Sequence, residues 1–589
     1  MSSPAGRHIW FLHQRGTIRL EDEVRLAVLW AARGLGAFAL GVFFILASQR
    51  GVPRSVLQEQ WEPTMQFAAL GVVALGYGVA WRWEGIGGAI VLVGSIFLGI
   101  LATLAFEPRV ALFGCLAFFV PGALFILYWQ HHHRPVTLAG VISFMVALLV
   151  LGGAAAGQVY DHYAGPTHPN SKAERIPVDL AEWIWSGAVT TDGFMVKARL
   201  SDPGKETVEL LVAPINERAD VKVVAPQSRP SLDGNVVTFR AEGLLPGARY
   251  TYALRRGEHI DEGRRGEVAT LPAGPSSFTI AVASCARVAS NGQVFDRIRE
   301  ANPLLYINTG DFHYQNISAN DPGAIRSAYD RSLATPGQQA LYLQAPIVYT
   351  WDDHDFGGDG SDRTTPAREA AQGVYRDYIP HYNLPAGDET GPIYHAFTVG
   401  RVRFIVTDGR SERDPVGEPD GAGKSLLGQA QKDWLKEELL AARESAALIV
   451  WVNSVPWIAQ PEPGADHWGN YATERRELSD FVVASGIDNL MMLSGDAHML
   501  AADDGSNNTF ASDGAGPGFP VFHAAALDRP GSVKGGPYSE GTYPGGGQFG
   551  LLTITDTGGA GVSVAFSGRN WEGTELVGYS FTVSAGGPE

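Results

Sequence analysis

The sequence predicts a three-part chain, in which an all-α transmembrane region is followed by a small β-sandwich and then by a larger α/β domain. Three observations support this prediction. Five apolar stretches fall within residues 26–160, short β-type runs separated by turn residues fill 176–272, and strands alternate with helical stretches over 276–585. The 589 residues are several times the usual size of one domain, so more than one domain is expected.

The net charge of the chain limits the classes of partner that it can bind. Lys and Arg number 45 against 62 Asp and Glu, which gives a formal net charge of −17. This balance argues against a nucleic acid as the main partner, so any bound phosphate must be attracted locally. No feature of the sequence indicates a protein partner.

The five apolar stretches are the basis for the transmembrane prediction. Each approaches the ~20 residues that a helix needs to cross a bilayer. A soluble helical bundle would need more polar surface than these stretches leave. The stretches are 26–48, 66–82, 86–106, 109–129 and 136–159. We therefore expect a five-helix region over 26–160, with the lipid bilayer as its partner.

The basic residues in the short loops predict the orientation of these helices, because Lys and Arg favour the cytoplasmic side. Six arginines fall on one side of the predicted topology and three on the other. The six are Arg7, Arg15, Arg19, Arg25, Arg82 and Arg134, and the three are Arg50, Arg54 and Arg109. This bias places residues 1–25 in the cytoplasm and everything after Tyr160 outside, in a multi-pass protein of the cell membrane. The spans carry no set of carboxylates for an ion relay, which favours an anchor or partner-binding unit over a transporter.

The segment 176–272 follows a linker at 161–175 and shows no long helical period. Its β-type runs include Phe194–Leu200 and Val236–Arg240, and the run of residues 244–252 resembles the turn and strand of fibronectin type III modules. We therefore expect a small β-sandwich. A single copy beside a larger domain is more often a packing spacer than a ligand-binding module.

The predicted strands after Pro275 alternate with helical stretches such as Leu426–Arg443, which is the pattern of an α/β layered fold. Ligand chemistry in such folds gathers at the strand ends. Five of six strand ends here supply residues able to ligate a metal. The six are residues 284–285, 310–314, 351–355, 408–410, 453–454 and 495–498. Carboxylates suit calcium or magnesium, whereas thiolate, phenolate and imidazole suit iron, so two unlike metals are expected.

The cysteines add to this expectation. The chain has only two, Cys115 in the fourth apolar stretch and Cys285, so Cys285 has no partner for a disulfide in the exterior part. Alone, Cys285 would be interpreted as a small buried hydrophobe. Its place at the end of the first strand of the α/β part favours metal ligation instead.

Taken in order, the strand-end motifs resemble those of the alkaline phosphatase D family of metallophosphatases. The motifs are Cys285, Gly-Asp-x-x-Tyr with Asp311 and Tyr314, Trp-Asp-Asp-His-Asp at 351–355, Asp408-x-Arg410 and Ser-Gly-Asp-x-His at 494–498. The resemblance covers 176–585 and implies a four-layer, calcineurin-like α/β domain over 276–585. It also implies a dinuclear metal site.

The resemblance assigns the ligands as follows. Asp311 would bridge the two metals. Cys285, Tyr314 and His498 would complete the shell of Fe(3+), and Asp353, Asn453 and Asp496 would complete that of Ca(2+) or another hard divalent ion. The segment Asn-Ser-Val-Pro that begins at Asn453 could equally form a strand-ending turn.

The remaining polar residues at these strand ends are candidates for catalysis. Two metal ions lower the pKa of a water molecule and neutralise the phosphoester, which otherwise resists anionic attack. His354 is the candidate general acid, and Asp355 or Asp352 could fix its ring. Arg410 is the candidate phosphate clamp, with Arg287 as a second candidate.

The sequence thus predicts a membrane-anchored, extracytoplasmic phosphoester hydrolase that acts on monoesters or diesters, and the Gly-rich stretch 513–550 is expected to form loops around its site. No dinucleotide-binding glycine motif and no Walker loop is present. Two alternatives remain: a phospholipase D-type lipid diesterase, and a membrane binding protein with an inactive phosphatase domain. Against the second, every expected ligand position holds a competent donor.

Overall fold

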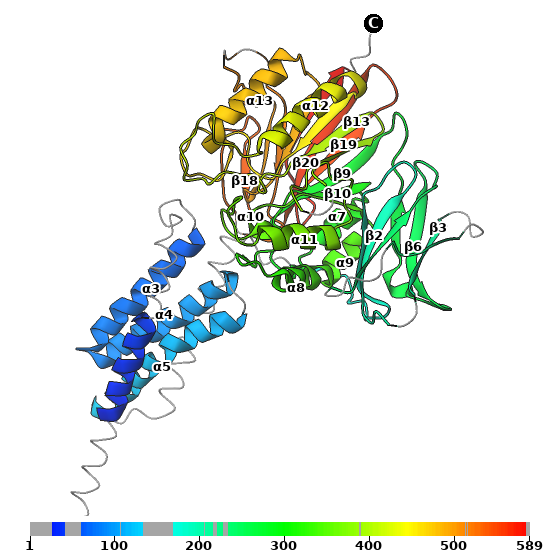
Figure 1. Cartoon of the computed structure of the whole chain (residues 1–589). Coiled ribbons are helices and arrows are strands. Elements are labelled where there is room, and N and C mark those ends of the chain that lie inside the picture. Colours follow the sequence, from blue (N-terminus) through cyan, green and yellow to red (C-terminus); the bar gives the residue numbers. More distant parts are fainter. Residues whose placement is uncertain are drawn as a thin grey trace, which may run out of the picture. The chain divides into compact units, whose positions relative to one another are not determined.

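The computed structural model describes residues 26–41, 61–105, 108–133 and 169–584, with short gaps at 205–206, 216–220, 228–233, 388–389, 513, 515, 517 and 530. The chain divides into two compact units, Met1–Tyr160 and Asp161–Glu589. Each unit has its own buried apolar core. Figure 1 shows helices in the first unit, and sheets with helices in the second.

The first unit is helical in its described part. It contains a helix over residues 26–41, α3 (Trp61–Ala80), α4 (Glu84–Ala105) and α5 (Pro108–His133). One buried cluster includes Val73, Val91 and Phe118, which come from three different helices. The turn between α3 and α4 needs glycine at position 87, because a Cβ there would lie 2.1 Å from the backbone nitrogen of Ala80. The unit is therefore a bundle with close helix contacts.

The structure supports fewer membrane spans than the sequence predicts. Among the described residues, only Glu84–Leu101 is long and apolar enough to cross a bilayer, by length and composition alone. Three further apolar helices are shorter, at Leu26–Gly41, Ala68–Ala80 and Cys115–Gln130. The predicted fifth span, 136–159, lies outside the described residues. The five-helix transmembrane region is thus not supported, because only one stretch of the described residues combines the length and the apolar composition of a span.

The second unit contains three β-sheets. The largest has nine strands in the order β21 (Glu575–Ser584), β20 (Gly561–Asn570), β19 (Gln548–Thr555), β9 (Phe278–Ala283), β10 (Leu305–Asn308), β11 (Ile347–Tyr349), β1 (Ala181–Gly187), β2 (Phe194–Leu200) and β5 (Val236–Ala241). The second has seven, in the order β12 (His395–Val399), β13 (Val402–Val406), β14 (Leu448–Val452), β15 (Leu490–Ser494), β17 (Val521–Ala524), β16 (Met499–Asp503) and β18 (Thr542–Pro544). Strands β9, β10 and β11 pair in parallel, as do β13, β14, β15 and β17.

Helices cover the outer faces of these two sheets. Alternate residues of a strand point to opposite faces. Ile280 and Val282 of β9 share one core with Val450 of β14, whereas Ala281 faces a second core formed with α7–α9 and α11. A third core joins the other face of β14 to α12 and α13, which lie together in Figure 1. The helices are α7 (Val294–Glu300), α8 (Pro322–Leu333), α9 (Pro336–Tyr342), α10 (Asp353–Phe356), α11 (Arg368–Tyr378), α12 (Gln429–Ser445) and α13 (Ala472–Ala484). The layering is therefore helix, sheet, sheet, helix, which confirms the predicted α/β fold.

Three strands of the segment predicted as a β-sandwich, β1, β2 and β5, belong to the nine-stranded sheet. A third sheet contains β4 (Lys222–Val224), β3 (Glu209–Pro214), β6 (Arg249–Arg256), β7 (His259–Ile260) and β8 (Gly266–Ala269), and it shares a core with β2 and β5. Strand β1, however, pairs in parallel with β11, where Gly187 lies opposite Ile347. A Cβ at Gly187 would lie 2.5 Å from the carbonyl oxygen of Ile347, so glycine permits this junction. The exact domain boundaries stay a prediction.

Candidate active site

The predicted ligand residues follow the carboxyl ends of strands from both large sheets. Cys285 follows β9, Asp311 follows β10, Asp353 begins α10 just after β11, and Asp496 follows β15. Neighbouring parallel strands end at the same edge of a sheet, so residues from distant parts of the sequence meet there. The side chains of Cys285, Asp311, Tyr314, Asp353 and Asp496 are all buried.

Three of these residues have a left-handed backbone. The φ angles are 61° at Cys285, 54° at Asp311 and 72° at Asp496. Such values cost energy for residues other than glycine and cluster at functional sites. The surrounding loops hold them, since Cys285 N donates to the carbonyl of Gly310 (3.2 Å) and Ala286 N donates to that of Asp311 (2.9 Å).

One half of the site joins a thiol, a phenol and an imidazole to Asp311. The Tyr314 hydroxyl donates to Asp311 Oδ2 (2.7 Å) and lies 3.0 Å from His498 Nε2. The Cys285 Sγ lies 3.6 Å from the same Asp311 oxygen. Burial, followed by the charge of Asp311, raises the pKa of Cys285 and that of Tyr314 well above their usual values. Both groups hold their protons in this arrangement. We call this half, made of Cys285, Tyr314 and His498, the soft half.

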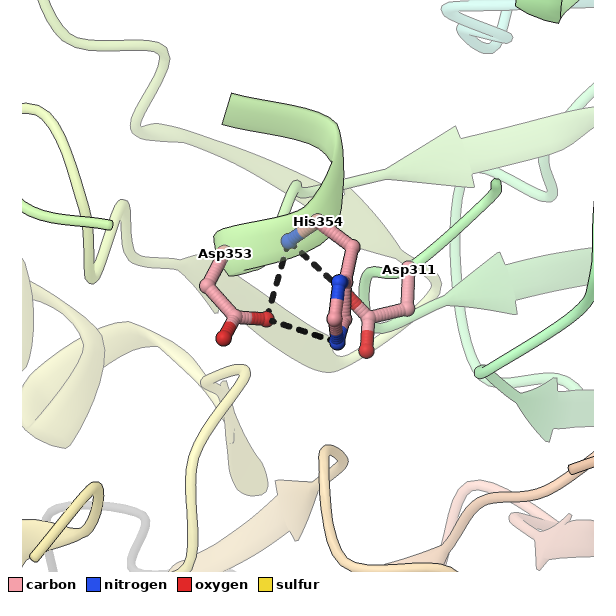
Figure 2. A group of neighbouring side chains, drawn as sticks. All are labelled: Asp311, Asp353 and His354. Carbon is pink, nitrogen blue, oxygen red and sulfur yellow. Dashed lines mark hydrogen bonds and ion pairs between the residues drawn. The ribbon is translucent and has the colours of Figure 1, made fainter. Parts of the chain in front are cut away.

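The other half is rich in carboxylates. Figure 2 shows Asp311, Asp353 and His354 facing one another, with His354 on α10. The His354 amide donates to Asp353 Oδ1 (2.9 Å) and to Asp311 Oδ1 (3.3 Å). Ligand atoms of Asp311, Asp353 and His354 lie within 4.8 Å of one another, and so do those of Asp311, Asp352 and Asp496. We call this half, made of Asp352, Asp353 and Asp496, the hard half.

The hard half fits a divalent cation. Burial and the neighbouring carboxylates raise the pKa of Asp311 well above its usual value, and burial does the same for Asp496. The Oδ2 atom of Asp352 is buried and has no hydrogen-bond partner among the described residues. Buried carboxylates at this density need a positive charge. Oxygen donors of this kind are those that calcium and magnesium prefer.

Arg410 binds a carboxylate of the hard half from the protein interior, and its guanidinium is not exposed to solvent. Its side chain is 0% exposed. Its Nε donates to Asp352 Oδ1 (2.6 Å), Nη2 to Asp466 Oδ2 (3.0 Å) and Nη1 to the carbonyl of Ser361 (3.2 Å). The geometry does not support the predicted phosphate clamp, because these donors are already engaged inside the protein. Arg410 instead positions the Asp352 carboxylate.

The ring of His354 is held by Asn316, whereas the sequence suggested Asp355 or Asp352. Its Nδ1 bonds the side-chain oxygen of Asn316, and the ring packs against that of Tyr314 with the ring centres 4.0 Å apart and the planes tilted by 36°. Burial lowers the pKa of His354 to about 4. Asp355 accepts from the amides of His313 (3.2 Å) and Asp352 (3.3 Å), and burial raises its pKa to about 7. Asp355 therefore shapes the turn that carries His354.

Asn453 lies near the site but its amide is engaged elsewhere. Its Oδ1 accepts from Val455 N and from Trp468 Nε1, both at 3.1 Å, and its Nδ2 donates to Ser494 Oγ (3.1 Å). This is the strand-ending turn that the sequence left open as the alternative to a ligand. In this structure, Asn453 braces the ends of β14 and β15.

Two cations at the site were not singled out from the sequence. Lys534 Nζ donates to both oxygens of Asp496, at 2.6 and 2.9 Å. The Arg529 guanidinium lies 4.1 Å from the centre of the Tyr314 ring. Both belong to the Gly-rich stretch 513–550, which the sequence predicts to form loops around the site. That prediction is the only sequence signal that could have pointed to them. Arg287, the second predicted clamp, is bound to Asp528 through Nε (3.3 Å) and its own backbone amide (2.8 Å).

Comparisons with known proteins match the part of the chain that carries this site. Residues 280–535 match the family model described as PhoD-like phosphatase, and residues 21–137 match a model described as a domain of unknown function, DUF7670. Alkaline phosphatase D of Bacillus subtilis (strain 168) is 24% identical over 330 residues, which cover 48% of this chain and 56% of that protein. The chain thus matches little more than half the length of this curated relative.

A solved structure described as "Structure of PhoD" has the same fold. It superposes with a TM-score of 0.57 at 19% identity, over 71% of this chain and 92% of that one. The aligned share exceeds that of the family model, which agrees with the joining of β1, β2 and β5 to the large sheet. The family match and the relative together support a metal-dependent phosphoesterase. Residues 280–535 of this chain form a PhoD-like phosphatase domain.

Proposed function

We propose that this chain is a membrane-anchored, extracytoplasmic phosphoester hydrolase, an alkaline phosphatase or phosphodiesterase with a dinuclear metal site. The observation that carries the proposal is the position of Asp311. One of its oxygens faces Cys285 and Tyr314 in the soft half, and the other accepts from the amide of His354 beside Asp353. One carboxylate shared by unlike donor sets is what a bridging ligand requires.

The donor sets favour two different ions. Cys285, Tyr314 and His498 with Asp311 would hold Fe(3+), since sulfur, phenolate and imidazole are ligands for iron. Asp353 and Asp496 with Asp311, and Asp352 behind them, would hold Ca(2+) or another hard divalent ion. When bound, the two ions supply Lewis acidity and an activated water at neutral to alkaline pH.

His354 is the residue best placed to move a proton. Its Nδ1 is occupied by Asn316, so Nε2 is the atom that would serve the leaving oxygen. Because burial lowers its pKa to about 4, the ring is neutral at alkaline pH and must receive a proton before it donates one. Arg529, beside Tyr314, takes the role of attracting the anionic substrate that was predicted for Arg410.

The apolar first unit supports the membrane anchor. Its described surface exposes large hydrophobic side chains, and Glu84–Leu101 has the length and composition of a span. The exposed residues include Trp30, Phe38, Leu75, Trp83 and Ile86. Soluble proteins seldom expose so many large apolar groups together.

The deciding experiment measures metal content, visible absorption and hydrolysis on the full chain purified from membranes in detergent. Iron with a tyrosinate absorption band, together with turnover of a chromogenic phosphate monoester or diester at alkaline pH, would support the proposal. The ratio of the two rates separates a monoesterase from a diesterase, and lipid substrates in mixed micelles test the phospholipase D-type alternative. A folded, metal-free and inactive protein would favour the binding-protein alternative.

Orientation needs its own test, because the proposal places the phosphatase domain outside the cytoplasm. A reporter enzyme that is active only outside the cytoplasm, fused after Glu589, should be active. Activity of a reporter that works only in the cytoplasm would overturn the extracytoplasmic placement.

A further inference from the structure

Lys534 makes the closest contact of any cation described here to a predicted metal ligand. Its ammonium lies 2.6 Å and 2.9 Å from the two oxygens of Asp496. The Asp496 side chain is 5% exposed and that of Lys534 is 29% exposed, so the pair sits at the mouth of the hard half. The charges of Asp466 and Asp353 also act on this ammonium.

The segment that carries Lys534 is fixed to the strand ends that carry the ligands. Leu527 N donates to the carbonyl of Ser284 (3.0 Å), and Ser532 N donates to that of His498 (3.0 Å). Two residues beyond Lys534, Gly536 N donates to the carbonyl of Ile458 (2.7 Å). The backbone on both sides of Lys534 is therefore anchored, whereas its side chain is held by the bonds of its ammonium to Asp496.

The ammonium and a metal ion compete for the same carboxylate. Both oxygens of Asp496 accept from Lys534, and a divalent ion on Asp496 would repel a cation within hydrogen-bonding distance. Metal binding to Asp496 therefore weakens this ion pair. A lysine released at the mouth of the site is a compact charge with three donors, which suits the oxygens of a phosphoryl group.

We propose that Lys534 is a functional residue of this site with two successive partners: it neutralises Asp496 while the hard half lacks its metal, and it binds the phosphoryl oxygens of the substrate once a metal takes over that carboxylate. This inference rests on the proposed function, because it assigns Asp496 to a metal. It makes Lys534 both a competitor of the metal and a substrate-binding residue.

The first test is a titration of the metal-free full chain with Mn²⁺ alone, in which free Mn²⁺ is counted by electron paramagnetic resonance. Lys534→Gln removes the competing charge, so it should bind Mn²⁺ about tenfold more tightly than the wild type. Lys534→Arg keeps the charge and should stay within about twofold of the wild type. Lys436→Gln is the matched control, because Lys436 also pairs with a carboxylate, Glu477 at 2.6 Å, with 23% of its side chain exposed. It should leave the affinity unchanged.

The second test measures binding of inorganic phosphate to the metal-loaded proteins by calorimetry. Lys534→Gln should bind phosphate about tenfold more weakly, and its KM should rise more than its kcat falls. Equal Mn²⁺ and phosphate affinities in Lys534→Gln and the wild type would overturn the role of Lys534 and leave the proposed function standing. A wild type that binds no metal would overturn the proposed function, and this inference with it.

Discussion

The two halves of the site differ in how their buried polar side chains avoid an uncompensated charge. In the soft half, Cys285 and Tyr314 stay neutral because burial raises the pKa of each well above its usual value. In the hard half, the carboxylates are balanced by cations of the chain itself, Arg410 on Asp352 and Lys534 on Asp496. The soft half must therefore lose protons to take up a metal, whereas the hard half must lose an ion pair.

This difference has a consequence for metal loading. Affinity in the soft half should rise steeply with pH, because thiol and phenol ligands bind as anions. Affinity in the hard half should depend more on the strength of the internal ion pairs than on pH. On the proposed assignment, the two metals would load under different control although they would share Asp311.

The largest effect should come from removing the group that joins the two halves. Asp311→Asn should lower kcat/KM by about 1,000-fold or more, since a neutral amide cannot bridge two cations. Metal analysis should show loss of both ions. A variant that keeps full activity would contradict the assignment of the site.

Replacing His354, the proposed proton carrier, should leave metal binding in both halves unchanged. His354→Gln is expected to lower kcat by about 100-fold, which is typical for loss of general acid–base catalysis. The metal content should remain that of the wild type, and substrates with good leaving groups should be affected least. If the variant instead loses the divalent ion, His354 is a ligand of the hard half and not a proton carrier.

A change confined to the soft half should affect only one metal. Tyr314→Phe removes the hydroxyl that bonds Asp311 and lies beside His498. We expect loss of the visible absorption band and about tenfold weaker iron binding, with the divalent ion retained. Equal loss of both ions would mean that the halves are not separate units.

The smallest effect concerns the crowding of carboxylates near the hard half. Burial raises the pKa of Asp355 to about 7. Because an unfolded Asp has a pKa near 3.9, the metal-free native state binds the extra proton between about pH 4 and pH 7, and this contribution to stability is lost as pH rises through 7.

The Asp355→Asn variant has no carboxyl group at this position that could bind the extra proton in the native state. Relative to the wild type, the metal-free variant should gain about 2 kcal/mol in free energy of unfolding between pH 5 and pH 8. Urea unfolding of both proteins at the two pH values measures this difference. A constant difference would show that Asp355 ionises normally.

The residues predicted from sequence and those found by structure differ for physical reasons. Strand ends of parallel sheets converge, so a metal-ligating residue after each strand was enough to predict the meeting of Cys285, Asp311 and Asp496. The burial of Arg410 could not be predicted, since the same arginine can clamp a substrate or hold a carboxylate. Lys534 lies 38 residues beyond Asp496 in a loop with no regular period, and only tertiary structure pairs them.

The sequence likewise predicted some features of the fold and missed others. Alternating strands and helices predicted the layered α/β fold, because the spacing of apolar residues in each element indicates which of its faces is buried. Nothing in a strand pattern reports its neighbour in a sheet, so the pairing of β1 with β11 was missed. In the first unit, composition indicated apolar helices, but only one stretch of the described residues is both long and apolar enough for a span.

The continuous nine-stranded sheet means that 176–272 is more than a spacer. Trp185 on β1 packs 5.8 Å, ring centre to ring centre, from Phe312, the residue after Asp311, and its indole donates to the carbonyl of Tyr378 (2.9 Å). A fragment that starts at Pro275 would leave the edge of β11 bare. An apolar strand edge without a neighbour recruits other chains. Loss of 176–272 by proteolysis in front of Pro275 would therefore favour aggregation of the remaining α/β part.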